Sequence, residues 1–212
     1  VQDVSLSITE GEVHALLGEN GAGKSTLTKM AAGVVPITRG KILLAGEELS
    51  FSSPADALRK GIAMVFQETS LVPSLTVAQN LYLGDEKAFN RLRPLYIAAQ
   101  QFLQSLNFPV DPTANVASLG AAQRQMVEIA RAVRKNARII IFDEPTATLT
   151  PEEKQHFFEL IERLKERGCS VIFISHALEE ALAISDRITI LRDGKLVITD
   201  ETGKFDRPTI AL

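Results

Sequence analysis

The chain has 212 residues, 45% of them hydrophobic, which is enough for one large core or for a core with a smaller satellite domain. A formal net charge of -3 gives no general attraction for nucleic acid or for an anionic membrane. The single cysteine, Cys169, excludes a disulfide framework and a zinc site built from cysteine pairs, so we expect it to be a small packing residue. The longest apolar runs have the length of strands, which predicts no membrane-spanning helix and no signal peptide.

The first elements in the chain are strands. Residues 4–8 (VSLSI) alternate between apolar and polar, a pattern that predicts a strand in the middle of a sheet. Because the chain begins at Val1 without a methionine and this strand follows almost at once, we expect it to be a fragment of a longer protein. Residues 13–17 (VHALL) predict a buried strand, in which His14 is a packed structural histidine, and residues 27–32 predict a helix.

Residues 18–26 (GENGAGKST), between this strand and this helix, fit the pattern G-x-x-x-x-G-K-[ST]. The glycines let the backbone turn tightly with several N–H groups aimed inward, Lys24 supplies a charge for the outer phosphates, and Ser25 offers a hydroxyl to Mg²⁺. The alternative is a glycine-rich turn with an accidental lysine. The strand and helix on either side favour a cradle for a nucleoside triphosphate, formed by Glu19, Asn20, Gly21, Ala22, Gly23, Lys24, Ser25 and Thr26.

The elements that follow are signalled by turns and caps. Residues 41–44, with the turn Ala45-Gly46, predict a hairpin at the margin of a sheet. Ser53-Pro54 predicts the capped start of a helix, and a second apolar strand leads into residues 65–68 (VFQE). Residues 73–135 are mostly helical, with the clearest periodicity over 95–106 and 123–133.

The acidic pair Asp143-Glu144 ends the apolar run 138–142, as expected for a central parallel strand that brings acids to the carboxyl edge of a sheet. Asp143 is suited to hold Mg²⁺, and Glu144 to orient and deprotonate an attacking water. Alone, such a pair could simply cap the next helix; the phosphate loop upstream favours the chemical interpretation.

The last third of the chain again alternates strands with helices. Thr150-Pro151 predicts another capped helix start, residues 172–176 (IFISH) a strand that ends in histidine, and residues 188–198 a hairpin that turns at Asp193-Gly194. The whole pattern predicts an α/β fold: a phosphate-loop NTPase core with a mainly parallel sheet, an antiparallel margin and an inserted helical subdomain. We expect residues 1–72 and 136–212 to form the nucleotide-binding core and 73–135 the helical subdomain.

Five motifs, taken together and in this order, resemble the ATP-binding cassette of ABC transporters over nearly the whole chain. They are the phosphate loop, the glutamine loop at Gln67, the segment 118–123, the acidic strand and His176. The amino-acid sequence further resembles the amino-terminal cassette of importers of the sugar type over residues 11–20, 123–132 and 186–194. Importers of this type take up monosaccharides and some nucleosides. The resemblance implies an ATP hydrolase, with ATP and Mg²⁺ as cofactors, that energises the import of a sugar or a related small polar solute.

The resemblance also implies the role of each motif residue. Glu144, His176 and Gln67 are the expected catalytic group, and Ser25, Gln67 and Asp143 the expected metal group. The signature would act on the ATP held by the opposite cassette, through Ser118, Leu119, Gly120, Ala121, Ala122 and Gln123.

Two residues depart from the family pattern. Gly120 stands where the family has a serine whose hydroxyl meets the γ-phosphate, so we expect weakened activation of the opposite site, although Gly120 could also serve only as a flexible helix start. Thr150 stands where the family usually has an aspartate in the loop that crosses to the opposite cassette; it keeps the helix cap and loses the charge.

The resemblance implies partners as well. We expect a second cassette, usually fused in the same polypeptide, transmembrane permease subunits that dock near residues 67–83, and indirectly a solute-binding protein, with no nucleic acid. The chain would then lie at the cytoplasmic face of the cell membrane, peripheral through the permease subunits. Two other readings stay open: an ABC ATPase that acts on nucleic acid or the ribosome, and a nucleotide sensor without turnover. The absence of sustained heptads disfavours the coiled-coil repair relatives, and Glu144 disfavours the sensor.

Overall fold

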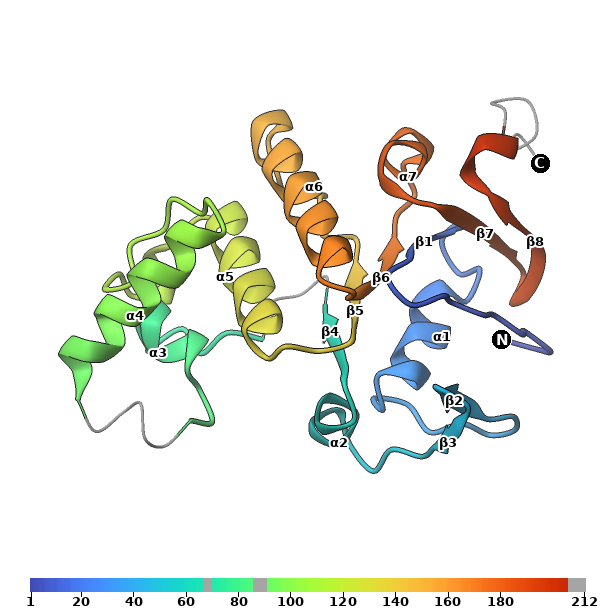
Figure 1. Cartoon of the computed structure of the whole chain (residues 1–212), viewed down its shortest axis with the longest axis horizontal. Coiled ribbons are helices and arrows are strands. Elements are labelled where there is room, and N and C mark those ends of the chain that lie inside the picture. The colour runs from blue at the N-terminus through green and yellow to red at the C-terminus, as the bar shows by residue number, and fades with distance from the viewer. Residues whose placement is uncertain (67–69, 86–90, 206–212) are drawn as a thin grey trace. The chain divides into compact units, whose positions relative to one another are not determined.

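The computed structural model describes residues 1–66, 70–85 and 91–205. The chain divides into two compact units (Figure 1). Unit 1 comprises Val1–Met64, Ala137–Glu144 and Ile161–Leu212, and unit 2 comprises Val65–Asn136 and Pro145–Leu160. The units differ from the domains predicted from sequence over residues 65–72, at residue 136 and over residues 145–160, and the predicted division stays a prediction.

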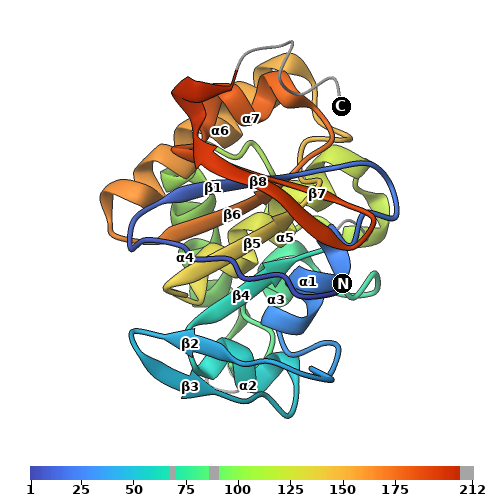
Figure 2. The ribbon, with the colours of Figure 1, turned by 90° about the vertical axis from the view of Figure 1, so that its right-hand side faces the viewer.

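A six-stranded sheet dominates unit 1, with the order β4-β5-β6-β1-β7-β8 (Figure 2); the last residue of β4, Val65, is the first residue of unit 2. Its strands are β1 (Val13–Leu17), β4 (Ile62–Val65), β5 (Ile139–Asp143), β6 (Ser170–Ile174), β7 (Arg187–Arg192) and β8 (Lys195–Glu201). The pairs β5–β6, β6–β1 and β1–β7 are parallel and β7–β8 is antiparallel. This confirms the predicted α/β fold with a mainly parallel sheet and an antiparallel margin.

The central strands are apolar on both faces because helices cover both faces of the sheet. On one face Leu16, Ile141 and Ile174 belong to a buried cluster against which Leu27 of α1 (Lys24–Ala31) packs. On the other face Ala15 and Ile188 pack with Ala181 of α7 (Leu178–Ile184). Buried continuous strands of this kind position whatever follows their carboxyl ends.

Two hairpins occur at the predicted residues, and both turn in the same way. The first, β2–β3, forms a two-stranded sheet of its own and does not lie at the margin of the six-stranded sheet as predicted. β2 (Ile42–Leu44) pairs with β3 (Glu47–Leu49) through Ala45 and Gly46, whose φ angles are 53° and 85°. β7 pairs with β8 through Asp193 and Gly194, with φ angles of 50° and 75°. Positive φ at both central residues is the geometry of the two-residue turn that matches the twist of paired strands.

The predicted helix caps are also confirmed. Ser53 Oγ accepts the N–H of Asp56 at 3.2 Å, at the start of α2 (Pro54–Arg59). At the start of α6 (Pro151–Glu166), Thr150 Oγ1 accepts the N–H of Glu153 at 3.3 Å, and the Glu153 carboxylate accepts the N–H of Thr150 at 2.9 Å. Both start signals therefore act through the side-chain oxygens that the sequence supplies.

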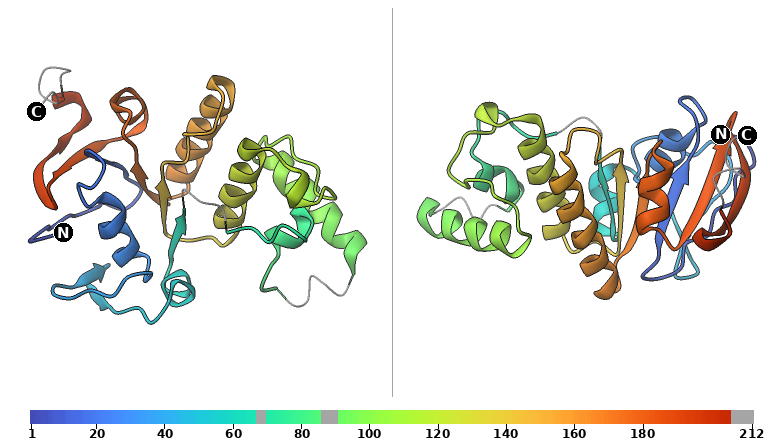
Figure 3. Two further views of the ribbon diagram at one scale, coloured as in Figure 1. Left: turned by 180° about the vertical axis from the view of Figure 1, so that it is seen from behind. Right: turned by 90° about the horizontal axis from the view of Figure 1, so that it is seen from above.

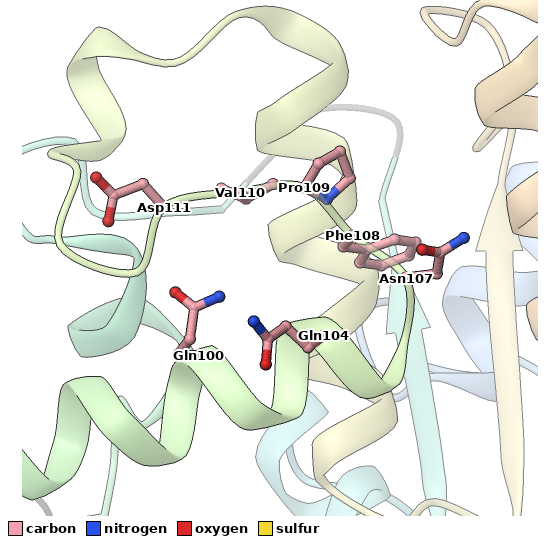
Figure 4. A pocket seen from close by; sticks show the side chains of 7 residues that line it. All are labelled: Gln100, Gln104, Asn107, Phe108, Pro109, Val110 and Asp111. Atoms are coloured by element: carbon pink, nitrogen blue, oxygen red, sulfur yellow. The ribbon is translucent and has the colours of Figure 1, made fainter.

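Unit 2 is mainly helical over its first segment. The helix α3 (Val77–Leu81) packs against α4 (Leu92–Ser105) and α5 (Ala121–Arg134), as both views in Figure 3 show. A single turn of 3-10 helix, η2 (Val116–Ser118), precedes α5, and another, η3 (Thr202–Lys204), follows β8 in unit 1. A hollow of about 400 Å³ opens beside α4, and none of its lining residues belongs to the predicted site (Figure 4): Gln100, Gln104, Asn107, Phe108, Pro109, Val110 and Asp111.

The strand predicted at residues 4–8 is wrong. These residues are not part of either sheet, although Val4 and Ile8 are partly buried against the core of unit 1. The alternation therefore reports correctly which side chains face the core. It does not report whether a neighbouring strand is available for ladder hydrogen bonds, and that condition is set by tertiary structure.

Two buried side chains have the structural roles expected of them. His14 is fully buried, with Nδ1 at 2.6 Å from the Glu12 carboxylate and Nε2 at 2.7 Å from the Thr189 hydroxyl. Burial lowers the pKa of His14, so the ring is neutral near pH 7. Cys169 is buried with its Sγ at 3.4 Å from the Ala137 carbonyl, and burial raises the pKa of the thiol to about 11. No helix in the described part of the chain is long and apolar enough to cross a membrane.

Candidate nucleotide site

The phosphate loop joins β1 to α1, and its lysine lies inside it. Gly23 caps α1 with φ 99°, a left-handed conformation that glycine adopts freely. Lys24 Nζ donates to the carbonyl oxygens of Gly18 at 2.6 Å and Glu19 at 3.1 Å, and only 6% of the residue is exposed. Two neutral carbonyl oxygens therefore hold the ammonium group over the loop. Negatively charged phosphate oxygens are stronger acceptors and would replace these carbonyls as its hydrogen-bond partners.

Ser25 and Asp143 meet although 118 positions separate them. Ser25 Oγ donates to Asp143 Oδ1 at 3.3 Å, from the first turn of α1 to the last residue of β5. Burial raises the pKa of Asp143; the Ser25 hydrogen bond opposes that shift, and repulsion from Glu144 adds to it. A hydroxyl beside a buried carboxylate is an oxygen pair that Mg²⁺ prefers, and a cation would offset the buried charge, so these residues fit the ion.

Glu144 and His176 form the next pair. His176 Nδ1 lies 3.5 Å from Glu144 Oε1, with the imidazole 66% and the carboxylate 17% exposed. The Glu144 N–H donates to the Ile174 carbonyl at 3.1 Å, and Glu144 has φ 48°. A left-handed glutamate is uncommon, and such residues cluster at functional sites. The sequence carried no signal of this conformation.

The sheet explains why these segments converge. In the parallel pairs β5–β6 and β6–β1, Ile174 lies opposite both Asp143 and Leu16. The carboxyl ends of three neighbouring strands therefore deliver the loop, the acidic pair and His176 to one edge, the usual ligand edge of an open α/β sheet. The structure brings together Lys24, Ser25, Asp143, Glu144 and His176; their chemical roles stay predictions.

The predicted signature lies in unit 2, at the start of α5. Gly120 is the residue before the helix, with φ -67° and ψ 166°, and its N–H donates to the Gln123 side chain at 3.3 Å. Glycine has no hydroxyl to return to the helix, so only half of a capping box forms. Ser118 Oγ donates to the Asn115 carbonyl at 2.7 Å and is engaged locally.

Gln67, predicted both as a catalytic residue and as a metal ligand, lies outside the described residues. Across residues 1–66, 70–85 and 91–205, no three His, Cys, Asp or Glu side chains gather in a way that could hold a metal ion. If Mg²⁺ binds here, Ser25 and Asp143 would supply two protein oxygens, and the phosphates of a nucleotide usually supply further ligands at such a site.

Known proteins match this chain over most of its length. The ABC transporter family matches residues 1–147. The chain is 48% identical over 203 residues to the ribose import ATP-binding protein RbsA 1 of Rubrobacter xylanophilus, covering 92% of this chain and 40% of that protein. It is 44% identical over 213 residues to the galactose/methyl galactoside import ATP-binding protein MglA of Fusobacterium nucleatum, covering 99% of this chain and 43% of that protein. It thus spans about four-tenths of the length of these relatives.

Solved structures share the fold. A nucleotide-free ATP-binding cassette from an ABC transporter superposes with a TM-score of 0.82 at 25% identity, covering 93% of this chain and 83% of that one. The dimeric cassette MJ0796, bound to ADP and Pi in a post-hydrolysis state, also gives 0.82 at 26% identity, covering 94% and 89%. On the sequence match and the shared fold, the chain belongs to the ABC transporter family.

Proposed function

We propose that this chain is the ATP-binding and ATP-hydrolysing part of a motor that energises the import of a sugar or a related small polar solute. The observation that carries the proposal is the convergence of Lys24, Ser25, Asp143, Glu144 and His176 at one sheet edge. The names of the relatives supply the transported class, because those proteins are described as ATP-binding proteins of ribose and galactose import.

The geometry supports a phosphoryl transfer to water. Lys24 and the loop N–H groups would hold the β- and γ-phosphates, with Ser25 and Asp143 as the side chains that would hold Mg²⁺. When bound, that ion supplies positive charge to the phosphate oxygens. Glu144 would accept a proton as the water oxygen bonds to the γ-phosphorus and the bond to the bridging oxygen breaks, which yields ADP and phosphate. His176, beside Glu144, would contact the γ-phosphate.

A second cassette, permease subunits and a solute-binding protein complete the proposed assembly. The relatives are more than twice as long as this chain, which supports a second cassette in the same polypeptide. In that assembly residues 1–72 and 136–212 would act as the nucleotide-binding core, with residues 73–135 presenting the signature to the partner's ATP. The chain would lie peripherally at the cytoplasmic face of the membrane through the permease subunits.

The alternative of an ABC ATPase that acts on nucleic acid or the ribosome is not favoured. The relatives with 44–48% identity are named for import. The net charge of -3 also gives the chain no general attraction for a polyanion.

Sugar uptake by cells tests the proposal. A strain that lacks the full-length gene is complemented with the parent, with Lys24→Ala, or with Lys41→Ala as a matched control at an exposed lysine. We expect the parent and the control to restore uptake of labelled ribose or galactose, and Lys24→Ala to restore none. Loss of the buried ammonium should also weaken ATP binding in calorimetry by about 2–3 kcal/mol. Full uptake with Lys24→Ala would reject the site.

A further inference from the structure

The hairpin β7–β8 contacts the phosphate loop at two points. A Cβ added to Gly18, at the start of the loop, would lie 2.3 Å from the Leu191 carbonyl oxygen, so the end of β7 passes directly against the loop backbone. Three residues later, the N–H of Gly194 donates to the Ala22 carbonyl at 3.1 Å. The second contact is a hydrogen bond from the tip of one element to the middle of the predicted phosphate cradle.

This hydrogen bond fixes the orientation of the whole Ala22–Gly23 peptide group, because the accepting carbonyl is part of it. The peptide bond between Ala22 and Gly23 is trans, so its C=O and its N–H point in opposite directions. A carbonyl held toward Gly194 therefore directs the Gly23 N–H away from the hairpin. Loop N–H groups are the donors that bind phosphate oxygens in such a cradle, so their direction matters for affinity.

The turn that supplies the donor is itself held in place. The Gly194 carbonyl accepts the N–H of Gln2 at 2.8 Å. Gly23 lies against the same region, since a Cβ on it would meet the Val1 side chain at 2.9 Å and the Gly194 Cα at 3.5 Å. Gly194 thus joins the loop, the hairpin and the first residues of the chain through backbone groups.

We propose that the Asp193-Gly194 turn is a positioning element for the phosphate loop: the Gly194 N–H sets the plane of the Ala22–Gly23 peptide and so presents the Gly23 N–H to phosphate. The proposal rests on the proposed function of the loop. It assigns no contact with nucleotide to Gly194, which acts through Ala22 and Gly23.

The other hairpin offers a matched control. Ala45-Gly46 between β2 and β3 has the same signs of φ as Asp193-Gly194, and a Cβ on Gly46 would meet nothing within 4 Å. Valine is strained in the left-handed region at either glycine, so Gly194→Val and Gly46→Val impose the same kind of backbone strain. At Gly194 the added Cβ would also lie 3.4 Å from the backbone of Val1, a contact of ordinary van der Waals length. Only Gly194→Val moves a donor away from the phosphate loop.

The first measurement is ATP–Mg²⁺ binding by calorimetry, with thermal unfolding alongside. We expect Gly194→Val to bind ATP about tenfold more weakly than the parent, as for the loss of one well-oriented hydrogen bond to a charged group. Gly46→Val should stay within about twofold while losing similar thermal stability. Asparagine tolerates the left-handed region, so Gly194→Asn should retain parental affinity. If Gly194→Val does not fold, Gly194→Ala takes its place, with about a threefold loss.

Equal affinities for Gly194→Val and Gly46→Val would overturn the inference. A second readout needs no nucleotide: in ¹⁵N-labelled protein, the Gly23 amide resonance should shift in Gly194→Val and stay unchanged in Gly46→Val. If the parent does not bind ATP, the proposed function fails, and the Gly23 resonance still decides whether the turn positions the loop. An unmoved Gly23 resonance in Gly194→Val rejects the inference whatever the affinity.

Discussion

At the scale of single residues, Glu144 combines a proposed chemical role with an unfavourable backbone. Its φ of 48° costs an ordinary side chain about 1 kcal/mol or more, and a glycine nothing comparable. Both Glu144→Gly and Glu144→Ala lack the carboxylate. We therefore expect the free energy of unfolding of Glu144→Gly to exceed that of Glu144→Ala by about 1 kcal/mol. Denaturant titration compares the two directly; a less stable glycine variant would contradict the strain argument.

Asp143 should make stability depend on pH in a predictable direction. Its pKa in the folded chain is raised above the ordinary 3.8 by burial, so its ionisation opposes folding. The contribution of Asp143 to the free energy of unfolding is most favourable below pH 3.8, where the carboxyl is protonated. That contribution is lost as the pH rises through the raised pKa of the folded state. Without nucleotide, Asp143→Asn should therefore be more stable than the parent at pH 7. The difference should close as the pH falls below 3.8, and a constant difference would count against this cause.

At the scale of elements, the start of α5 has an unfilled cap. Gly120 has φ -67°, and a Cβ there would meet nothing within 4 Å, so serine fits without strain. Gly120→Ser should raise the free energy of unfolding by a few tenths of a kcal/mol, since serine caps a helix only slightly better than glycine. Gly203→Ser, where a Cβ also meets nothing, is the control and should change stability less.

In the proposed two-cassette motor, the same Gly120→Ser change should increase hydrolysis at the ATP site of the second cassette, because it restores a hydroxyl at the predicted signature. An unchanged rate at that site, with the stability gain present, would show that Gly120 is only a helix start.

The predicted elements succeed where the pattern is local. Continuous apolar runs identify β1, β5 and β6, and turn pairs such as Asp193-Gly194 identify both hairpins. Residues 4–8 fail because a strand also needs a partner, which alternation does not encode.

The candidate site shows the same division. The phosphate loop is recognisable because its chemistry lies in consecutive residues. The Ser25–Asp143 contact, the left-handed Glu144 and the bond from Gly194 to Ala22 depend on which strands become neighbours. Ser25, Asp143 and Glu144 could be identified as site residues from the sequence, but the distances between them and the backbone conformation of Glu144 could not.

At the scale of the whole molecule, the two ATP sites of the proposed motor should be unequal. The site built on Lys24 and Glu144 uses the partner's signature, whereas the partner's site must use the segment 118–123 with its Gly120. Thr150 also caps α6 without the charge that the family usually has there. Glu144→Gln in the full-length protein should abolish most hydrolysis, about 10²- to 10⁴-fold at its own site. The equivalent change in the second cassette should remove a much smaller share of the total ATP hydrolysis. Equal losses of hydrolysis for the two single variants would contradict the asymmetry.

The buried thiol of Cys169 has a practical consequence. It is the single cysteine among the 212 residues, and with a pKa of about 11 it is almost entirely protonated at pH 7, whereas alkylating reagents attack the thiolate. A cysteine introduced at an exposed position such as Lys41 or Gln104 should therefore react with maleimide labels far faster than Cys169 does. Pairs of such labels, one in each unit, would let spectroscopic distance measurements follow the two units through the proposed ATP cycle in a chain that keeps its native cysteine.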